Sequence, residues 1–402
     1  MTPLLSVAEA RERLLALFSP LDAEPVPLAV AGGRVLAEDA VATRAQPPFA
    51  ASAMDGYAIR DEDHRVGARL AVIGASAAGA RFAGVVTPGT AVRIFTGAPV
   101  PDGADRVVIQ ENVTRVEDFV TLDEAAPGGT NVRPAGGDFR PGARIAAPRR
   151  LSPGDVALLA AMNVGAPIAR RRPVVALIAT GDELAIPGEA PGPDQILCSN
   201  SFGLKAMLEA AGAEARLLPI ARDTPDSLMA AFDLAAGADL IVTLGGASVG
   251  DHDLVQSTAL GRGLDLAFYK IAMRPGKPLM AGRLGATPMI GLPGNPVSAM
   301  VCGQLFVVPA VERMLGLPAE AAPVLRARLE TALDPNGPRA HYMMSRAWPG
   351  PDGWCLEPFA RQDSSLLSVL SEANALAIRP IADPARSAGD SIEFIWINST
   401  FN

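Results

Sequence analysis

The chain has 402 residues, of which 49% are hydrophobic and 19% charged, and its formal net charge is −8. This length predicts roughly two to four globular domains, each able to bury its own core. The acidic balance, and the lack of a Lys/Arg run interleaved with aromatics, exclude a nucleic-acid partner. Cys198, Cys302 and Cys355 show neither a disulfide framework nor zinc spacing, so we expect a reducing compartment.

The N-terminal residues contain a helix start in place of a signal peptide. Ser6 and Glu9 have capping-box spacing, and apolar residues follow at helical intervals. No uncharged apolar run approaches the length that crosses a membrane. We therefore expect a soluble, cytoplasmic protein.

The sequence pattern then changes several times along the chain. From about 46 to 140, short β-branched runs separated by Gly and Pro predict a β-rich module with the character of an insertion. Ser152, Pro153 and Asp155 then mark a helix start. From 173 to 315 the patterns alternate between strands, at 173–180, 215–220 and 239–244, and helices, at 202–211, 225–236 and 297–315. This alternation is typical of a parallel α/β sheet. Beyond about 318, short strands and turns predict a small β domain.

Three strand patterns, 239–244, 267–273 and 288–292, end in polar loops rich in Gly and Pro. The loops contain Gly245, Gly246, Ser248, Gly250, Asp251, Asp253, Arg274, Lys277, Pro293, Gly294, Asn295, Pro296 and Ser298. In an open parallel sheet such loops meet at the carboxyl edge, where ligands bind. Carboxylates, cations and hydroxyls gathered there predict a phosphate ester carrying a divalent metal.

A fourth acidic loop, Thr180 to Leu184, follows the strand pattern 173–179. Taken alone, Asp182 and Glu183 are equally consistent with a turn that caps a helix. Their place at the same sheet edge favours Mg²⁺, which takes few carboxylates together with water and substrate phosphate oxygens. Three loops of the β-rich module, 52–58, 95–99 and 136–138, also place an acid or hydroxyl beside glycine, but singly each is an ordinary turn.

A rival interpretation is a serine hydrolase. Gly246 to Gly250 fits the Gly-x-Ser-x-Gly elbow, with Ser248 as nucleophile. Of the histidines that follow, His252 is too near in sequence and His341 lies in the predicted terminal β domain. The sequence contains no dinucleotide-binding fingerprint and no P-loop. A purely structural glycine turn is the other alternative.

Six motifs occur in order along the chain, namely MDGYA, RIFTGAPVP, TGDEL, GGASVGDHD, RPGKP and GLPGNPVS. Together they resemble the molybdopterin molybdenumtransferase (MoeA) family, shared with the gephyrin E domain. The resemblance implies insertion of molybdenum from molybdate into adenylylated molybdopterin, with release of AMP and with Mg²⁺ or another divalent cation. It also implies a homodimer and transient contact with the molybdopterin adenylyltransferase. A scaffold or carrier that binds molybdopterin without catalysis is the alternative.

The resemblance implies a multidomain α/β plus β fold. A linking domain (1–45 and 141–170) carries the inserted β-rich domain (46–140). An α/β molybdopterin-binding domain (171–317), like the stand-alone adenylyltransferase, and a C-terminal β domain (318–402) follow. The implied site lies between the α/β domain of one subunit and the β-rich domain of the other.

On matching positions the resemblance implies roles for individual residues. The catalytic positions are Asp55, Thr96, Asp138, Glu183, Asp253 and Lys277. The ligand-binding positions are Gly245, Gly246, Ser248, Gly250, Arg274, Pro293, Gly294, Asn295, Pro296, Ser298, Ser364 and Ser365. The metal positions are Asp251, Asp253 and Glu183. Ser248, Asp253 and Lys277 also follow from the residues alone, whereas Asp55, Thr96 and Asp138 could not have been chosen over other turns.

Two positions depart from the family pattern. Cys198 stands where an Asp is frequent, which removes one metal or nucleotide contact. Met344 stands where Arg is frequent, so Arg361 or Arg346 is the expected substitute in an oxyanion pocket.

Overall fold

The structure is a computed structural model that describes residues 4–124, 128–246 and 254–397. The segment 247–253, with Ser248, Gly250, Asp251 and Asp253, lies outside the described residues, so the expectations for these four side chains stay predictions.

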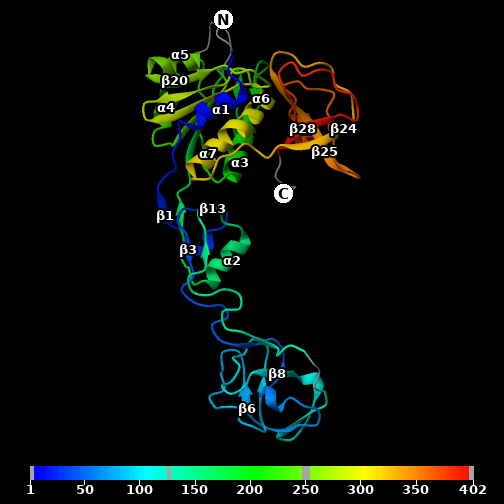
Figure 1. The fold of residues 1–402 in the computed structure, drawn as a ribbon. Coiled ribbons are helices and arrows are strands. Elements are labelled where there is room, and N and C mark those ends of the chain that lie inside the picture. Colours follow the sequence, from blue (N-terminus) through cyan, green and yellow to red (C-terminus); the bar gives the residue numbers. More distant parts are fainter. Residues whose placement is uncertain (1–3, 125–127, 247–253, 398–402) are drawn as a thin grey trace. The chain divides into compact units, whose positions relative to one another are not determined.

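The chain divides into two compact units (Figure 1). Unit 1 comprises Met1–Glu24, Gly33–Ala37 and Ala169–Asn402, and unit 2 comprises Pro25–Gly32 and Glu38–Ile168. The chain therefore passes from one unit to the other four times. The segments around these passages carry the short strands β1 (Ala23–Pro25), β2 (Val35–Leu36) and β14 (Ile168–Arg170), and β13 (Arg149–Arg150) belongs to the same four-stranded sheet.

Unit 2 is built on a six-stranded sheet with strand order β8-β5-β7-β6-β10-β9. Its strands are β5 (Gly56–Ile59), β6 (Arg69–Ser76), β7 (Thr90–Ile94), β8 (Arg106–Ile109), β9 (Val113–Val116) and β10 (Phe119–Leu122). All four residues of β5 are buried. Its side chains alternate between two apolar clusters on the two faces of the sheet: Tyr57 and Ile59 belong to one, and Ala58 belongs to the other together with Ile94. The β-rich module predicted from the sequence is confirmed.

Unit 2 also contains shorter elements outside this sheet. These are η1 (Leu28–Val30), β3 (Ala40–Val41), β4 (Ala51–Ser52), η2 (Asp61–Asp63), η3 (Gln110–Asn112), β11 (Val132–Arg133), β12 (Arg144–Ile145) and α2 (Pro153–Ala161). The predicted helix start at α2 is confirmed. The Ser152 hydroxyl accepts from the Asp155 N–H at 3.2 Å, and the Asp155 carboxylate accepts from the Ser152 N–H at 2.9 Å. These two bonds satisfy helix N–H groups that have no partner within the helix.

The centre of unit 1 is a six-stranded sheet with strand order β18-β15-β19-β23-β22-β20. Its strands are β15 (Val174–Ala179), β18 (Glu214–Leu217), β19 (Leu240–Leu244), β20 (Leu264–Tyr269), β22 (Met280–Leu284) and β23 (Thr287–Leu292). The first four strands in this order are parallel, which confirms the predicted α/β sheet, whereas β22 runs antiparallel to both of its neighbours. The predicted strand at 267–273 was placed too late, and β22 was missed because its Gly282 and Arg283 extend the loop texture before it.

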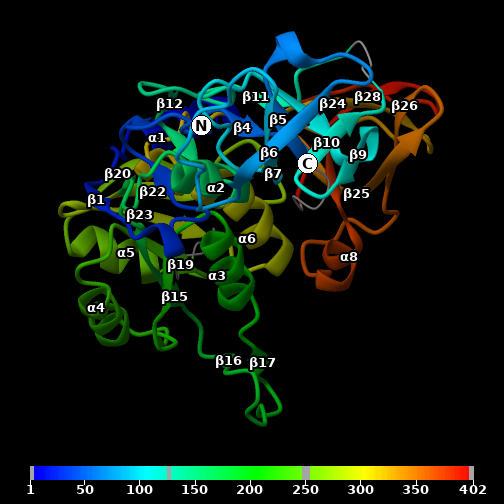
Figure 2. The same cartoon turned by 90° about the horizontal axis from the view of Figure 1, so that it is seen from below.

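Two helical layers cover this sheet. The layer on one face comprises α1 (Val7–Leu15), α3 (Asn200–Ala210), α6 (Pro296–Cys302) and α7 (Val308–Met314), and the other layer comprises α4 (Pro225–Leu234) and α5 (Leu254–Gly261). The capping box predicted for α1 is present, with Ser6 and Glu9 bonded to each other. In Figure 2, β16 (Leu184–Ala185) and β17 (Ile196–Leu197) extend beyond α3 as a narrow arm.

Helices α6 and α7 are joined through a π-helical turn, Gly303–Val307. Pro309 lies just after this turn, and a proline cannot donate to the carbonyl four residues earlier, which accounts for the wider turn. The continuous helix Pro296–Met314 is apolar enough to cross a membrane by length and composition only, although its last turn contains Glu312 and Arg313. In the fold, 67% of its apolar window is buried, as in the core helix of a globular domain.

The C-terminal part of unit 1 is a closed β-barrel, which confirms the predicted terminal β domain. Its strands are β24 (Leu325–Leu329), β25 (Ala340–Gly350), β26 (Gly353–Pro358), β27 (Ala375–Arg379) and β28 (Ser391–Trp396). Pairing of β25 with both β26 and β27 closes the barrel, and β21 (Met273–Arg274) adds to β25 as a parallel strand. Trp354, Phe394 and Trp396 pack edge to face inside it. Helix α8 (Leu367–Glu372) follows β26.

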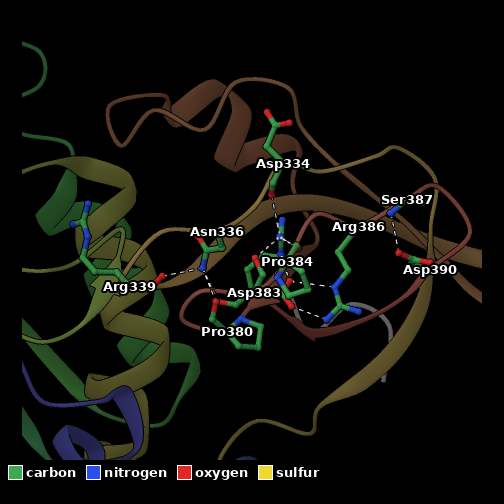
Figure 3. A network of polar contacts seen from close by, with 10 residues as sticks. Asp334, Asn336, Arg339, Pro380, Asp383, Pro384, Arg386, Ser387 and Asp390 are labelled. Carbon is green, nitrogen blue, oxygen red and sulfur yellow. Dashed lines mark hydrogen bonds and ion pairs between the residues drawn. The ribbon is translucent and has the colours of Figure 1, made fainter.

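A buried polar network holds two loops at one end of the barrel (Figure 3). Arg379 is 3% exposed and donates to the Asp383 carboxylate and to the carbonyl oxygens of Asp334 and Pro384. Arg386 donates to the same carboxylate at 2.6 Å, and this bond, together with Arg379, lowers the pKa of Asp383. A buried guanidinium and carboxylate that are fully hydrogen-bonded fix the loop geometry around them.

His341, on β25, lies beside this network and is 8% exposed. Burial, with the nearby charges of Arg274, Arg379 and Arg339, lowers the pKa of His341 to about 4 from its ordinary 6.5. The unfolded chain therefore binds more protons than the folded chain between these values, so stability falls as the pH drops.

We expect His341→Gln to remove this part of the acid sensitivity. Between pH 7 and pH 5 the wild-type free energy of unfolding should fall by about 2 kcal/mol more than that of the variant. Urea unfolding at both pH values measures the difference. Parallel losses in the two proteins would show that His341 is not buried in its neutral form.

Candidate functional site

Three strand ends meet at one edge of the α/β sheet, as predicted. The Thr180 N–H, just after β15, donates to the carbonyl of Leu244 at 2.9 Å. The Gly245 N–H, just after β19, donates to the carbonyl of Leu292 at 3.2 Å. The loops that begin at Thr180, Gly245 and Pro293 therefore lie next to one another.

Glycine is required in the middle loop. Gly245 and Gly246 have φ values of +102° and +63°, which L side chains rarely adopt. A Cβ on Gly245 would lie 2.7 Å from the Thr180 carbonyl oxygen, and one on Gly246 would lie 2.1 Å from the Val255 Cγ2. The two glycines thus allow the chain after β19 to pass close to Thr180, at the start of the neighbouring loop, and close to Val255 of α5.

The loop after β23 begins helix α6 at the same edge. Pro296 occupies the first helical position, which suits its fixed φ, and Ser298 in the first turn is 4% exposed. The Asn200 side chain donates to the carbonyl of Gly294 at 2.7 Å. No local sequence pattern distinguishes Asn200 from other polar residues at helix starts.

Residues 362–365 come to this helix start from the barrel. The Val297 N–H donates to the carbonyl of Ser364 at 2.9 Å. The Ser365 hydroxyl donates to Asp363 at 2.6 Å, so it closes a local turn. Of the two predicted serines, Ser364 is therefore the one whose hydroxyl has no local partner among the described residues.

The RPGKP loop also lies at this edge. It connects the end of β20 to the start of β22, where Tyr269, Met280 and Gly291 stand in register. Gly276 has φ +108°, and a Cβ there would lie 2.5 Å from the Cys302 sulfur, so the loop packs against α6. Lys277 is half-buried in this loop, and Arg274 is exposed on β21, next to β25 of the barrel.

Glu183 is the one predicted metal ligand that the structure describes, and it is exposed at the end of β15. Its Oε2 would lie 2.4 Å from a Cβ on Gly181, so the carboxylate folds back over the strand end. Within residues 4–124, 128–246 and 254–397, no three His, Cys, Asp or Glu side chains gather as a preformed metal cage.

A second cluster lies in unit 2. Asp55, just before β5, accepts hydrogen bonds from the main-chain N–H and the hydroxyl of Thr96, each at 2.7 Å. The hydroxyl and then the N–H of Thr96 lower the pKa of Asp55, since both favour the charged carboxylate. Asp55 is therefore ionised at neutral pH and points at the loop after β7.

We expect Thr96→Val to raise the pKa of Asp55 towards its ordinary value of 3.8. The hydroxyl donor is lost while the main-chain donor stays, so the shift should be partial. A pH titration of the carboxyl carbon by NMR measures it. An unchanged Asp55 pKa would mean that the hydroxyl is not bonded to the carboxylate in solution.

The three loops that looked like separate turns in the sequence lie together in unit 2. Ser52 exchanges main-chain hydrogen bonds with Gly97 and Ala98, and the Ala53 N–H donates to Asn131 at 2.8 Å. Asp138 and Gly97 line one cavity of about 620 Å³. Asp55, Thr96 and Asp138 thus belong to adjoining loops of one unit, although they are far apart in the sequence.

The two departures from the family pattern have structural explanations. Met344 is 2% exposed and packs in the main core, and its main chain is bonded to the Gln362 amide, so it offers no polar contact. Arg346 lies 3.9 Å from Glu372, and Arg361 is exposed. Cys198 is buried, with its sulfur 3.1 Å from the Ser201 hydroxyl. Neither Met344 nor Cys198 is placed to contact a ligand.

Three family models match the chain in order. They describe the MoeA N-terminal region (domain I and II) at residues 5–163, a probable molybdopterin-binding domain at 176–313 and the MoeA C-terminal region (domain IV) at 326–397. The molybdopterin molybdenumtransferase of a Nostoc species is 34% identical, over 97% of this chain and 93% of its own length. The chain belongs to the molybdopterin molybdenumtransferase family.

Other members of the molybdopterin molybdenumtransferase family agree with this assignment. Molybdopterin molybdenumtransferase 2 of Mycobacterium tuberculosis is 36% identical over 92% of the chain and 94% of its own length. The structure of the molybdopterin biosynthesis MoeA protein from Pyrococcus horikoshii OT3 matches with a TM-score of 0.80 at 27% identity, covering 98% of this chain and all of that one. The predicted family and multidomain fold are confirmed.

Proposed function

We propose that the chain inserts molybdenum from molybdate into adenylylated molybdopterin and releases AMP. It is a transferase of molybdenum cofactor biosynthesis, like its curated relatives. The observation that carries the detailed proposal is the meeting of the Gly245, Pro293 and RPGKP loops at one sheet edge. Main-chain N–H groups and two cations there suit a pyrophosphate and an oxyanion.

In this proposal Lys277 and Arg274 bind the tetrahedral oxyanion, and the loop after β19, with Ser248, donates hydrogen bonds to phosphate oxygens. Water cleaves the phosphoanhydride to give AMP and the phosphate of molybdopterin, and the two thiols of the dithiolene bind molybdenum as one molybdate oxygen leaves with their protons as water. Glu183, with Asp251 and Asp253 of the segment outside the described residues, would hold Mg²⁺. When bound, this ion supplies positive charge against the pyrophosphate.

We propose further that the active form is a homodimer in the cytoplasm that receives its substrate from the adenylyltransferase. The Asp55 cluster of one copy and the strand-end cluster of a second copy would act on the same substrate molecule. The three buried, free cysteines support a reducing compartment.

Turnover by the purified chain tests the function. Adenylylated molybdopterin, molybdate and Mg²⁺ should yield AMP and protein-bound molybdenum in equal amounts, and tungstate titrated against molybdate measures oxyanion preference. Binding of the pterin without AMP release would indicate the scaffold alternative. Ester turnover blocked by serine-directed reagents would indicate a hydrolase that uses Ser248.

A further inference from the structure

The cavity beside Asp138 has two walls that are fastened together. Residues 46–49 form one wall and residues 133–138 the other. The Asp138 N–H donates to the Gln46 carbonyl at 2.9 Å, and the Gly136 N–H donates to the Pro47 carbonyl at 2.8 Å. Because both bonds join main chain to main chain, the spacing of the walls is fixed before any ligand arrives.

The lining combines an apolar surface with polar groups. Rings of Pro47, Pro48, Phe49 and Pro134 line it, and the polar members are Gln46, Arg133 and Asp138. The volume of about 620 Å³ falls in the range of small-molecule sites. The flat ring of Phe49 and the apolar faces of the three prolines suit a planar heterocycle, which is rigid and loses little conformational entropy on binding.

The charged groups of this lining are not paired with each other. Arg133 and Asp138 are both exposed, and no ion pair or hydrogen bond joins their side chains among the described residues. A carboxylate and a guanidinium that line one small cavity can together bind a ligand edge that presents two donors and an acceptor.

We propose that this cavity binds the pterin ring of the substrate. Asp138 accepts from the ring N3–H and the 2-amino group, and Arg133 donates to the neighbouring 4-oxo oxygen. The inference rests on the proposed function, which supplies a pterin as substrate, and it gives Asp138 a defined contact on it.

The Asp138 carboxylate also distinguishes a pterin from the adenine of the AMP moiety. The corresponding edge of adenine presents one amino group beside an unprotonated ring nitrogen. If the carboxylate faces adenine, one of its oxygens meets the unprotonated ring nitrogen, and both of these atoms are acceptors. A pterin instead offers two donors, N3–H and the 2-amino group, one for each carboxylate oxygen. The cavity therefore selects the pterin end of the adenylylated substrate.

Binding of two small probes to the full chain tests the proposal. One is 6-hydroxymethylpterin, and the other is 6-hydroxymethyllumazine, which carries an oxygen in place of the 2-amino group. Wild-type protein should bind the pterin at least about tenfold more tightly, because lumazine sets its 2-oxo oxygen against Asp138. No binding of the pterin at millimolar concentration, or equal binding of both probes, would overturn the proposal.

The variant Asp138→Asn sharpens the test. An asparagine can accept from N3–H and donate to the 2-oxo oxygen, so the variant should prefer lumazine over pterin. Asp118→Asn, at an exposed carboxylate of the same unit, is the matched control and should keep the wild-type preference. Far-UV circular dichroism confirms that both variants are folded. An unchanged preference in folded Asp138→Asn would contradict the proposed contact.

The failures of the two proposals can be distinguished. If the wild-type chain turns over substrate but Asp138→Asn keeps its pterin preference, the pterin contact is wrong and the transferase function stands. If the wild-type chain selects the pterin but never releases AMP, the cavity assignment stands and the function fails. Arg133→Gln should weaken pterin and lumazine alike, since both retain the 4-oxo group, and loss of only one would contradict the role of Arg133.

Discussion

Replacing Lys277 by glutamine is expected to lower the kcat/KM for AMP release about 100- to 1000-fold. Lys277 is half-buried in the loop that packs against Cys302 at the end of α6, and a partly buried, fixed ammonium interacts with an oxyanion more strongly than in water. Glutamine keeps the length of the side chain and its packing but removes the charge. Steady-state turnover with molybdate as the varied substrate measures the loss.

The matched control for this variant is Lys270→Gln. Lys270 lies in the same loop, with its ammonium 4.4 Å from the Tyr269 ring centroid, so its charge already has a partner in the protein. It should retain at least about half of wild-type turnover. Equal losses of turnover in the two variants would show that the reaction depends on the total positive charge of the loop and not on a specific contact made by Lys277.

Gly56→Ala is expected to destabilise unit 2 by about 3 kcal/mol and to abolish turnover. A Cβ on Gly56 would lie 1.9 Å from the carbonyl oxygen of Val108 on the neighbouring strand, which no rotation of a side chain can relieve. Because β5 pairs with β8 at this point, the strands must separate, and Asp55, one residue earlier, moves away from Thr96. Urea unfolding followed by circular dichroism measures the loss of stability.

Gly165→Ala is the control for this substitution. A Cβ at Gly165 has no atom within 4 Å, and its φ is not in the left-handed region, so stability should change by less than about 0.5 kcal/mol. A stable Gly56→Ala protein would mean that the close approach of β5 and β8 does not exist in solution.

Much of the fold followed from local sequence patterns. The capping boxes at Ser6 and Ser152 specify helix starts through neighbouring residues, and both are present. The apolar run before Gly245 predicted a buried parallel strand, because such strands are covered on both faces. Strand β22 was missed, since its Gly282 and Arg283 look like a continuation of the loop before it. The domain boundaries at 45, 140, 170 and 317 stay predictions.

Less of the candidate site than of the fold could be predicted from the sequence. Lys277 and Arg274 could be placed at the sheet edge because they follow a strand pattern, and the connection from β20 to β22 does lie there. The bond between Asp55 and Thr96 spans 41 residues and depends on the register of β5 with β7, which no local signal encodes. Asn200 was missed for the same reason, since its partner is the carbonyl of Gly294. The roles of all these residues in catalysis stay predictions.

Mixing two inactive variants tests the central claim most directly, namely that the Asp55 cluster and the strand-end cluster of different copies act on one substrate. Asp55→Asn and Lys277→Gln proteins, unfolded together in equal amounts and refolded, should recover about a quarter of the wild-type rate of AMP release. Half of the dimers are then mixed, and each mixed dimer has one of its two sites intact. A mixture no more active than either variant alone would contradict the account.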